Sequence, residues 1–322
     1  MIKAGIIGGA GYTAGELIRV LLNHPQVELA FVNSSSNAGN RLADVHEGLV
    51  GETDMKFTGE LPLDTIDVLF FCTAHGDTKL FMESHTLPAG LKVIDLSMDY
   101  RLKGEENDFI YGLPELNRIA IGHSTHVANP GCFATCIQLG LLPIAKAGLL
   151  QGEIVVNAIT GSTGAGVKPS ATSHYSWRND NMSIYKPFVH QHLPEILQSV
   201  KQLEPDYKGA IRFIPYRGCF ARGIFATLLM KCDRSLDELK ELYDSYYHDN
   251  SFVFCSDKDI DLKQVVNTNK CLLHLERYED ELLVTSCIDN LLKGASGQAV
   301  QNMNLLFGLE ETAGLKLKSS GF

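Results

Sequence analysis

Short apolar runs alternate with helix-like segments over the first 148 residues, and this order limits the fold more than any other feature of the chain. The run KAGIIG leads through a glycine turn into GELIRVLLNH, whose apolar residues recur at helical spacing. Further strand-like runs are VELAFVN, DVLFFCTA, LKVIDLS and THVAN, with the helix-like DTKLFMESH among them. Strands that alternate with helices form parallel sheets through right-handed crossovers. We therefore predict an α/β domain with a Rossmann-type parallel sheet over residues 1–148, which binds ligands at the carboxyl ends of its strands.

Longer strands dominate the second half of the chain. They are GEIVVNAITGS, GAIRFIPYR, GIFATLLMKC and the hairpin-like pair KCLLHLERYEDELLVTSCID, with one clear helix, SLDELKELYDSYYHD. Long strands with few helices between them indicate a mostly antiparallel sheet. We predict a second, α+β domain over residues 149–293. The apolar helix of the tail, about residues 294–322, is expected to pack back on the first domain.

Composition excludes several kinds of partner. The net charge of the 322 residues is −10, whereas binding to a nucleic-acid backbone needs a basic face. No apolar stretch approaches the roughly 20 residues that span a bilayer. The 8 cysteines show no CxxC pair, which is typical of a reduced, cytoplasmic protein. We expect no nucleic-acid partner, no membrane partner and no metal, because no nearby His or Cys completes a ligand set with Cys132 and Cys136.

A glycine-rich turn follows the first strand. Glycines at positions 8, 9, 11 and 15 let a backbone approach a pyrophosphate, whose charge the N-terminus of the next helix favours. The spacing departs from strict GxGxxG, and a tight strand–helix turn that binds nothing is the alternative. Its place in the first turn of an α/β chain favours dinucleotide binding.

The second strand ends in FVNSSSNAGNR, without the acidic residue that holds the ribose hydroxyls in NAD-binding folds. Ser34, Ser35, Ser36 and Arg41 offer hydrogen bonds to a 2′-phosphate instead. The segment therefore favours NADP(H) as cofactor. A solvated serine loop is the alternative interpretation.

Cys132 follows a strand and the turn residues Pro130 and Gly131, in HVANPGCFATCIQL. A thiolate is a nucleophile, and a helix N-terminus lowers the pKa of a thiol. A thiol beside a nicotinamide suggests aldehyde-level chemistry, in which the sulfur forms a thioester that a hydride reduces. The residues alone leave open whether Cys132 is this nucleophile or a small buried hydrophobe.

Two histidines are the best candidates for the proton partner that such a nucleophile needs. His190 and His192 precede Pro194 in YKPFVHQHLPEI, and Glu195 follows in the first turn of a helix, where it can orient an imidazole. An imidazole titrates near neutral pH, which suits both acceptance and return of a proton. The alternative is that one or both are surface loop histidines.

Eight motifs occur in the order of one family: GGAGYTAGEL, IDLSMDYRL, YGLPEL, NPGCFAT, GSTGAG, HQHLPEI, RGIFAT and DNLLKGASGQAVQNMNLLFGL. With them the chain resembles the N-acetyl-γ-glutamyl-phosphate reductases of arginine biosynthesis, and its last motif has a looser form in aspartate-semialdehyde dehydrogenases. The resemblance implies an NADPH-binding Rossmann domain, an α/β catalytic domain, Cys132 as nucleophile and one of the paired histidines as acid–base group. It also implies a cofactor loop at Gly8, Gly11, Tyr12, Thr13 and Gly15, Asn290 and Gln298 in the stretch beside the nicotinamide, and Arg222 near the substrate.

Some positions depart from the family pattern. Gln191 stands where the family usually has Arg between the histidines, and Val167 replaces an Arg in the GSTGAG loop. Because the substrate is an anion, a missing Arg bears on the pocket for the acyl group. Whether that group is N-acetyl or the bulkier, charged N-succinyl stays open.

The expected function is NADPH-dependent reductive dephosphorylation of an N-acyl-γ-glutamyl phosphate to the semialdehyde, through a Cys132 thioester. The alternatives are aspartate-β-semialdehyde dehydrogenase and a non-catalytic, NADP-binding regulator. The protein is expected to form a homo-oligomer, a dimer or a tetramer. Groups expected to hold the small anionic acyl phosphate, unless they are ordinary surface residues, are Asn129, Arg101, Ser162, Lys168 and Arg222.

Overall fold

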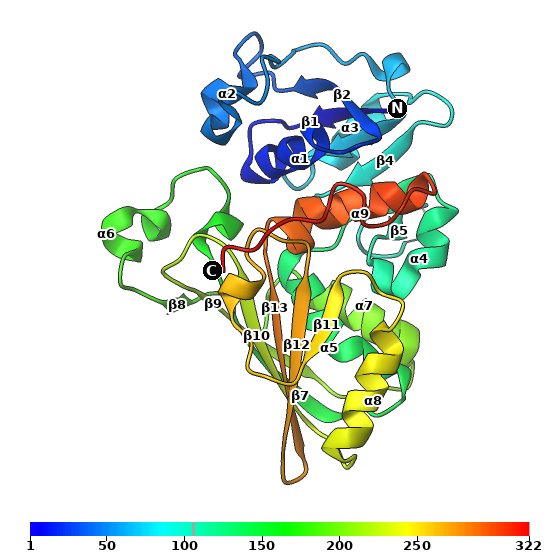
Figure 1. Ribbon diagram of the computed structural model, residues 1–322, viewed down its shortest axis with the longest axis vertical. Coiled ribbons are helices and arrows are strands. Elements are labelled where there is room, and N and C mark those ends of the chain that lie inside the picture. The colour runs from blue at the N-terminus through cyan, green and yellow to red at the C-terminus, as the bar shows by residue number, and fades with distance from the viewer. Residues whose placement is uncertain (105–106, 322) are drawn as a thin grey trace. The chain divides into compact units, whose positions relative to one another are not determined.

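The computed structural model describes residues 1–104 and 107–321, and the chain divides into two compact units (Figure 1). Unit 1 comprises Met1–Pro130 and Ala295–Lys316, and unit 2 comprises Gly131–Gly294 and Leu317–Phe322. Residues 105–106 and 322 fall inside the predicted domain ranges and lie outside the described residues. The domain ranges 1–148 with 294–322 and 149–293 remain predictions, whereas contacts within the chain place the helix after residue 131 in unit 2.

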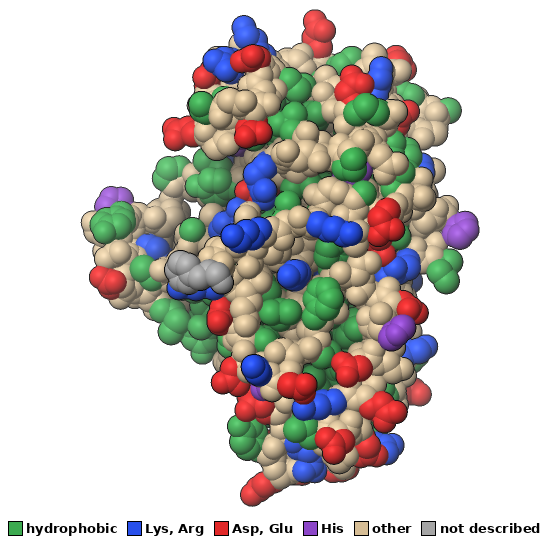
Figure 2. Space-filling view, viewed as in Figure 1, with side chains coloured by type: hydrophobic (Ala, Val, Ile, Leu, Met, Phe, Trp, Pro, Cys, Tyr) green, Lys and Arg blue, Asp and Glu red, His purple; other side chains and the backbone are tan. Residues whose placement is uncertain are grey.

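Acidic and basic side chains both occur across the face of the molecule in Figure 2. A uniformly basic surface, of the kind that binds nucleic acid, is absent from that face. In the described part of the chain, no helix combines the length and the apolar character that a membrane crossing requires.

Unit 1 is built on a six-stranded sheet in which every neighbouring pair is parallel. The predicted parallel sheet is therefore confirmed. In spatial order its strands are β2 (Val27–Asn33), β1 (Ile2–Ile7), β3 (Val68–Phe71), β4 (Lys92–Asp95), β6 (His126–Ala128) and β5 (Ile110–Tyr111).

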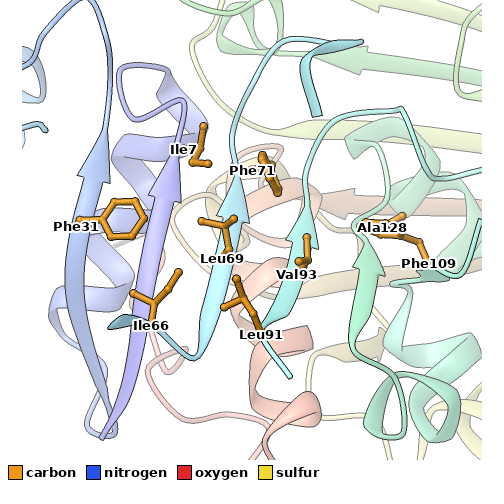
Figure 3. Close-up of a cluster of buried hydrophobic side chains, with 9 residues drawn as sticks. All are labelled: Ile7, Phe31, Ile66, Leu69, Phe71, Leu91, Val93, Phe109 and Ala128. Carbon is orange, nitrogen blue, oxygen red and sulfur yellow. The ribbon is translucent and has the colours of Figure 1, made fainter. Parts of the chain in front are cut away.

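Helices cover this sheet because its strands are apolar on both faces. Strand β3, for example, is buried along its whole length. Figure 3 shows part of the resulting core, in which Leu69, Phe71 and Val93 from neighbouring strands lie together. The C-terminal helix α9 contacts α1, α4 and β4 of this unit. The helices of unit 1 are α1 (Tyr12–Leu22), α2 (Leu42–Val45), α3 (Asp77–Ser84), α4 (Pro114–Gly122) and α9 (Gly297–Leu306).

Unit 2 is built on a seven-stranded mixed sheet. Its neighbouring pairs are antiparallel except β11 with β12 and β7 with β9, so the predicted mostly antiparallel sheet is confirmed. In spatial order the strands are β11 (Val253–Ser256), β12 (Cys271–Tyr278), β13 (Glu281–Ile288), β10 (Ile224–Lys231), β7 (Gln151–Thr160), β9 (Ile211–Arg217) and β8 (Ser183–Ile184).

Helix α5 (Cys132–Lys146) is the centre of unit 2 and lies behind the strands in Figure 1. It contacts β10, β13, α7 (Leu193–Leu203) and α8 (Leu236–Tyr247), and residues 133–145 are all buried. Pro143 inside the helix has no N–H for the Leu139 carbonyl, and the Tyr247 hydroxyl donates to that carbonyl instead. A fourth helix, α6 (Tyr175–Arg178), belongs to the long connection between β7 and α7.

Candidate active site

The glycine turn of unit 1 has the geometry of a phosphate-binding loop. Gly8 has a φ of +82°, and a Cβ there would lie 2.7 Å from the Cys72 carbonyl oxygen. Gly11 immediately precedes α1, and a Cβ on it would meet no atom within 4 Å. No side chain caps α1, and its first turn, which includes Tyr12 and Thr13, carries no acidic residue. The N–H groups at this helix start are therefore available to an anion.

A histidine that the sequence reasoning missed braces the same loop. The His46 ring, from the residue after α2, lies 2.7 Å through Nε2 from the Gly9 carbonyl oxygen. A Cβ on Gly15 would lie 2.7 Å from its Nδ1. The close approach of this ring therefore requires a glycine at position 15.

The end of β2 carries hydroxyls and no carboxylate. Ser34 is buried, whereas Ser35 and Ser36 are exposed, and the Asn37 side chain donates to the hydroxyl oxygens of Ser34 and Ser36. Arg41 forms a surface ion pair with Asp54, with 2.8 Å between Nη2 and Oδ1. An exposed pair of this kind contributes about 1 kcal/mol or less, so the guanidinium can exchange Asp54 for a phosphate at small cost.

Two of the predicted substrate residues, Arg101 and Asn129, lie in unit 1 and donate hydrogen bonds to its backbone. Arg101 is buried and donates from Nε to the Asn129 carbonyl, 2.9 Å, and from Nη2 to the Leu96 carbonyl, 3.0 Å. Asn129 donates from Nδ2 to the Ala295 carbonyl, 3.1 Å. These hydrogen bonds fix the backbone at the ends of β4 and β6 within unit 1. Gln298, on α9, is fully buried in the same unit.

Cys132 begins α5, as the sequence predicts for a residue after Pro-Gly, and its side chain is half-buried. The Gly131 N–H, directly before it, donates to Glu195 Oε2 at 3.1 Å. Glu195 lies in the first turn of α7 and is 2 % exposed. Two helix starts, one with the thiol and one with the histidine segment, are thereby joined.

Gly294 is a second residue that the sequence reasoning missed. It lies in a π-helical turn, Leu292–Ser296, in which its N–H donates to the Asp289 carbonyl five residues earlier. A Cβ on Gly294 would lie 2.8 Å from Cys132 Cβ. The only signal in the sequence is the glycine itself in LLKGASGQ, because nothing local shows that it meets residue 132.

His190 and His192 form one buried cluster with the start of α5. Their ring centres are 4.6 Å apart, and the Phe133 ring meets each of them edge-on. Burial, with a smaller effect of the Lys186 charge, lowers the pKa of His190 to about 4. Its Nδ1 accepts from the His192 N–H at 3.2 Å, so a neutral His190 carries its proton on Nε2. His192 Nε2 lies 3.9 Å from Glu195 Oε1.

The remaining predicted residues lie on loops of unit 2. Arg222 forms an ion pair with the fully buried Asp289, 3.1 Å, and its side chain is 21 % exposed. Asn290 accepts the Gly223 N–H at Oδ1, 2.7 Å, and donates to Thr163 Oγ1, 3.0 Å. Ser162 opens the short 3-10 helix Ser162–Ala165 and is half-buried, and Lys168 is exposed a few residues later.

No disulfide and no cluster of potential metal ligands occurs among the described residues. Cys136, one turn after Cys132, is buried, and its Sγ lies 3.4 Å from the Ser286 hydroxyl oxygen. Burial raises the pKa of the Cys136 thiol, as it does for Cys72 and Cys287. These thiols are structural, whereas Cys132 stands at a helix start, and the next residue, Phe133, packs against both imidazoles.

Comparison with known proteins identifies the class. Residues 3–124 match the family model "Semialdehyde dehydrogenase, NAD binding domain", and residues 132–290 match "Semialdehyde dehydrogenase, dimerisation domain". The fold is similar to that of an aspartate semialdehyde dehydrogenase with NADP from Candida albicans, with a TM-score of 0.72 and 16% identity over 95% of this chain and 98% of the other. The fold is also similar to that of aspartate semialdehyde dehydrogenase II from Vibrio cholerae, with a TM-score of 0.71 and 15% identity over 96% of this chain and 99% of the other.

The sequence relatives narrow this class. A protein of Phocaeicola vulgatus is 74% identical and one of Bacteroides thetaiotaomicron 71%, each over 100% of both chains. Both are named N-acetyl-gamma-glutamyl-phosphate reductase. The chain therefore belongs to the N-acetyl-γ-glutamyl-phosphate reductase family of semialdehyde dehydrogenases.

Proposed function

We propose that the protein reduces an N-acyl-γ-glutamyl phosphate to the corresponding semialdehyde, with release of phosphate, as a step of arginine biosynthesis. The observation that carries the proposal is the half-buried Cys132 at the start of α5, joined through Gly131 and Glu195 to the histidine pair of the same unit. A thiol at an uncapped helix start, next to imidazoles, is the arrangement that acyl transfer to sulfur needs. The names of the relatives supply the substrate class.

The first half-reaction transfers the acyl group to sulfur. His192 takes the Cys132 proton, and the Glu195 carboxylate beside it stabilises the imidazolium. The thiolate forms a bond to the γ-carbonyl carbon, the bond from that carbon to the phosphate oxygen breaks, and phosphate leaves. The oxyanion of the intermediate is stabilised by N–H groups of the first turn of α5.

The second half-reaction reduces the thioester. NADPH, when bound, supplies the hydride. The glycine turn at Gly8 and Gly11 and the start of α1 fit the pyrophosphate, while Ser34, Ser36 and Arg41 fit the 2′-phosphate. Neutral His190 donates a hydrogen bond from Nε2 to the oxyanion that forms on the former carbonyl and stabilises it. The oxyanion then re-forms a carbonyl as the carbon–sulfur bond breaks, the aldehyde leaves, and the His192 imidazolium returns its proton to the Cys132 thiolate.

Turnover in the reverse direction tests this function. Wild-type protein should reduce NADP only when phosphate and an N-acylglutamate semialdehyde are both present, with the N-acetyl and N-succinyl compounds offered separately. Aspartate semialdehyde should not be turned over. The variant Cys132→Ser should lose activity, whereas Cys219→Ser, at an exposed thiol, should keep it. Full activity of a folded Cys132→Ser variant contradicts the mechanism, and binding of NADP without turnover supports the regulator instead.

The rate at which iodoacetamide alkylates Cys132 distinguishes the proposed roles of His190 and His192. Because His192 takes the thiol proton, His192→Asn should slow alkylation at neutral pH. His190→Asn should alkylate at the wild-type rate and lose turnover, because the imidazole hydrogen bond is needed only after the thiol has attacked. The assignment is reversed if His190→Asn slows alkylation and His192→Asn does not.

We also propose a homodimer formed through the face of the unit 2 sheet that lies opposite α5. Leu229 points to this face and lies between Leu283 and Val155 on the neighbouring strands. Figure 2 shows hydrophobic side chains among the charged ones over these strands. Leu229→Asp should therefore shift sedimentation toward the monomer, with Leu80→Asp, an exposed position of unit 1, as control. An unchanged sedimentation coefficient of Leu229→Asp refutes this interface. A cytoplasmic location is part of the proposal, because a catalytic thiol needs a reducing compartment.

A further inference from the structure

Arg217 is the last residue of β9 and points to the same side of the sheet as the Cys132 site. Side chains alternate between the two faces of a strand, so Arg217 shares its face with Phe213. The Phe213 ring lies 5.1 Å from the Phe133 ring and 5.2 Å from the His190 ring. The guanidinium is thus brought toward the residues that adjoin Cys132.

Tyr185 stands between this guanidinium and the thiol. Cζ of Arg217 lies 4.7 Å from the centre of the Tyr185 ring, and that ring is 5.7 Å from the His190 ring. Burial raises the pKa of Tyr185, the negative charge of the Cys132 thiolate raises it further, and Arg217 opposes both. Because such effects fall with distance, both charged groups are close to the phenol.

Arg217 has no acidic partner in the part of the chain that the structure describes, and its Nε is buried there without a hydrogen bond. Other arginines of unit 2 are matched differently. Arg222 is held by Asp289, and Arg212, on the opposite face of β9, by Glu153. A guanidinium that is partly removed from water without an anion is costly, so Arg217 is suited to an anion from outside the chain.

Among the residues that the structure describes, Thr160 carries a second buried polar atom without a hydrogen-bond partner, and it is independent evidence for a ligand site beside Arg217. It is the register partner of Arg217 on the adjacent strand β7, and it is 2 % exposed. Within the described residues its Oγ1 is buried and has no hydrogen-bond partner. Nearly all buried polar atoms in proteins are hydrogen-bonded, and two exceptions side by side at one strand end mark a place for a polar ligand.

The charged groups around Arg217 and Thr160 indicate the charge of the ligand that this strand end would bind. Arg178 donates from Nη1 to the Arg217 carbonyl at 2.7 Å, and its pKa is lowered by burial and by the Arg217 charge. The Lys186 charge contributes to the lowered pKa of His190. Three cations therefore gather beside the Cys132 site, and a bound group that is stabilised there is an anion.

We propose that Arg217 binds an anionic group of the substrate and is a specificity-determining residue of the Cys132 site. The inference rests on the proposed function, whose substrates carry several such groups. A guanidinium forms two parallel hydrogen bonds equally well with a carboxylate or a phosphate. The phosphate, the α-carboxylate and the acyl carboxylate of an N-succinyl compound share this chemistry, and kinetics distinguish them.

The test compares wild type with Arg217→Gln, Arg217→Lys and, as matched control on the same strand, Arg212→Gln. KM values are measured in the reverse direction for inorganic phosphate, N-acetylglutamate semialdehyde and N-succinylglutamate semialdehyde. Loss of a charge-assisted pair should raise at least one KM of Arg217→Gln by about 10- to 150-fold. Arg217→Lys keeps the charge and should show a smaller rise, and Arg212→Gln should stay at the wild-type values.

The KM that rises identifies the bound group. A rise for phosphate alone assigns the phosphate, an equal rise for both semialdehydes assigns the α-carboxylate, and a rise for the N-succinyl compound alone assigns the acyl carboxylate. Wild-type KM values for all three in Arg217→Gln overturn the proposal. If circular dichroism shows that this variant is unfolded, the same result in Arg217→Lys overturns it.

Failure of this inference is distinct from failure of the proposed function. If wild type turns over and Cys132→Ser does not, unchanged Arg217 variants refute only the role of Arg217. If wild type itself shows no phosphate-dependent reduction of NADP, the proposed function fails and the assignment of Arg217 fails with it.

Discussion

A single methyl group at Gly294 should impair the nucleophile more than the fold. The Cβ of Gly294→Ala would lie 2.8 Å from Cys132 Cβ and 3.2 Å from its Cα. Carbon atoms pack at about 3.5–4.0 Å, so the two backbones must separate by roughly 0.7 Å or more. Both contacts are with the main chain and first side-chain atom of Cys132, so no rotamer change of the cysteine relieves them.

The expected losses of stability and of kcat/KM follow from this displacement of Cys132. Overpacking of this size costs about 1–3 kcal/mol of stability. A misplacement of about 1 Å at a reacting group costs roughly 100-fold in rate, so we expect kcat/KM of Gly294→Ala to fall by about 10- to 100-fold. Iodoacetamide alkylation of Cys132 should slow as well, because the sulfur leaves its position at the start of α5.

Gly140→Ala is the matched control. It lies on the same helix, and its Cβ would be 3.1 Å from the Leu228 side chain. This change should move the end of the Leu228 side chain by a few tenths of an ångström and leave alkylation of Cys132 at the wild-type rate. The reasoning is refuted if folded Gly294→Ala alkylates and turns over like wild type, or if Gly140→Ala loses thiol reactivity to the same extent.

Other predictions concern stability and cofactor binding. The pKa of His190 is about 4 in the folded protein against 6.5 when unperturbed, so the unfolded chain binds its proton more readily between these values. Stability should be full above pH 6.5 and fall by about 3 kcal/mol toward pH 4, and His190→Gln should lose this slope in urea titrations. Asp289→Asn leaves the charge of a partly buried guanidinium without its counter-ion and should cost about 3–5 kcal/mol, against at most about 1 for Glu153→Gln at the surface. Gly8→Ala should destabilise unit 1, whereas Gly11→Ala, with open space around it, should melt like wild type and bind NADPH more weakly. An unchanged dissociation constant for Gly11→Ala would argue against a dinucleotide at this turn.

The local sequence pattern was sufficient to predict a structural feature where that feature depends on a single segment of the chain. The alternation of apolar runs and helices predicts the parallel sheet of unit 1. A strand that is apolar on both faces, such as β3, is typical of a parallel sheet covered by helices on each side. The turn before Cys132 is equally local, since Pro130 and Gly131 end one element and allow the next to begin. The pairing of Glu195 with the histidine segment follows from helical spacing on α7.

Contacts between distant segments were not predictable in this way. Strands β5 and β8 have only two residues each, and helix α4 is interrupted by the non-helical backbone of Asn117. The parallel pairs β7–β9 and β11–β12 depend on register across long connections. Arg217, Gly294 and His46 look ordinary in the sequence, and each is significant only because the fold brings it to a residue far along the chain.

Helix α5 is surrounded by protein from Phe133 to Ala145, and this has a consequence for how unit 2 unfolds in denaturant. Amide hydrogens in such a segment exchange with solvent only when the whole unit opens, since no partial opening exposes them. The sulfur at its first residue is therefore carried by one of the last elements to yield. In a urea titration, the native rate of Cys132 alkylation and the cooperative structure of unit 2 should therefore be lost together.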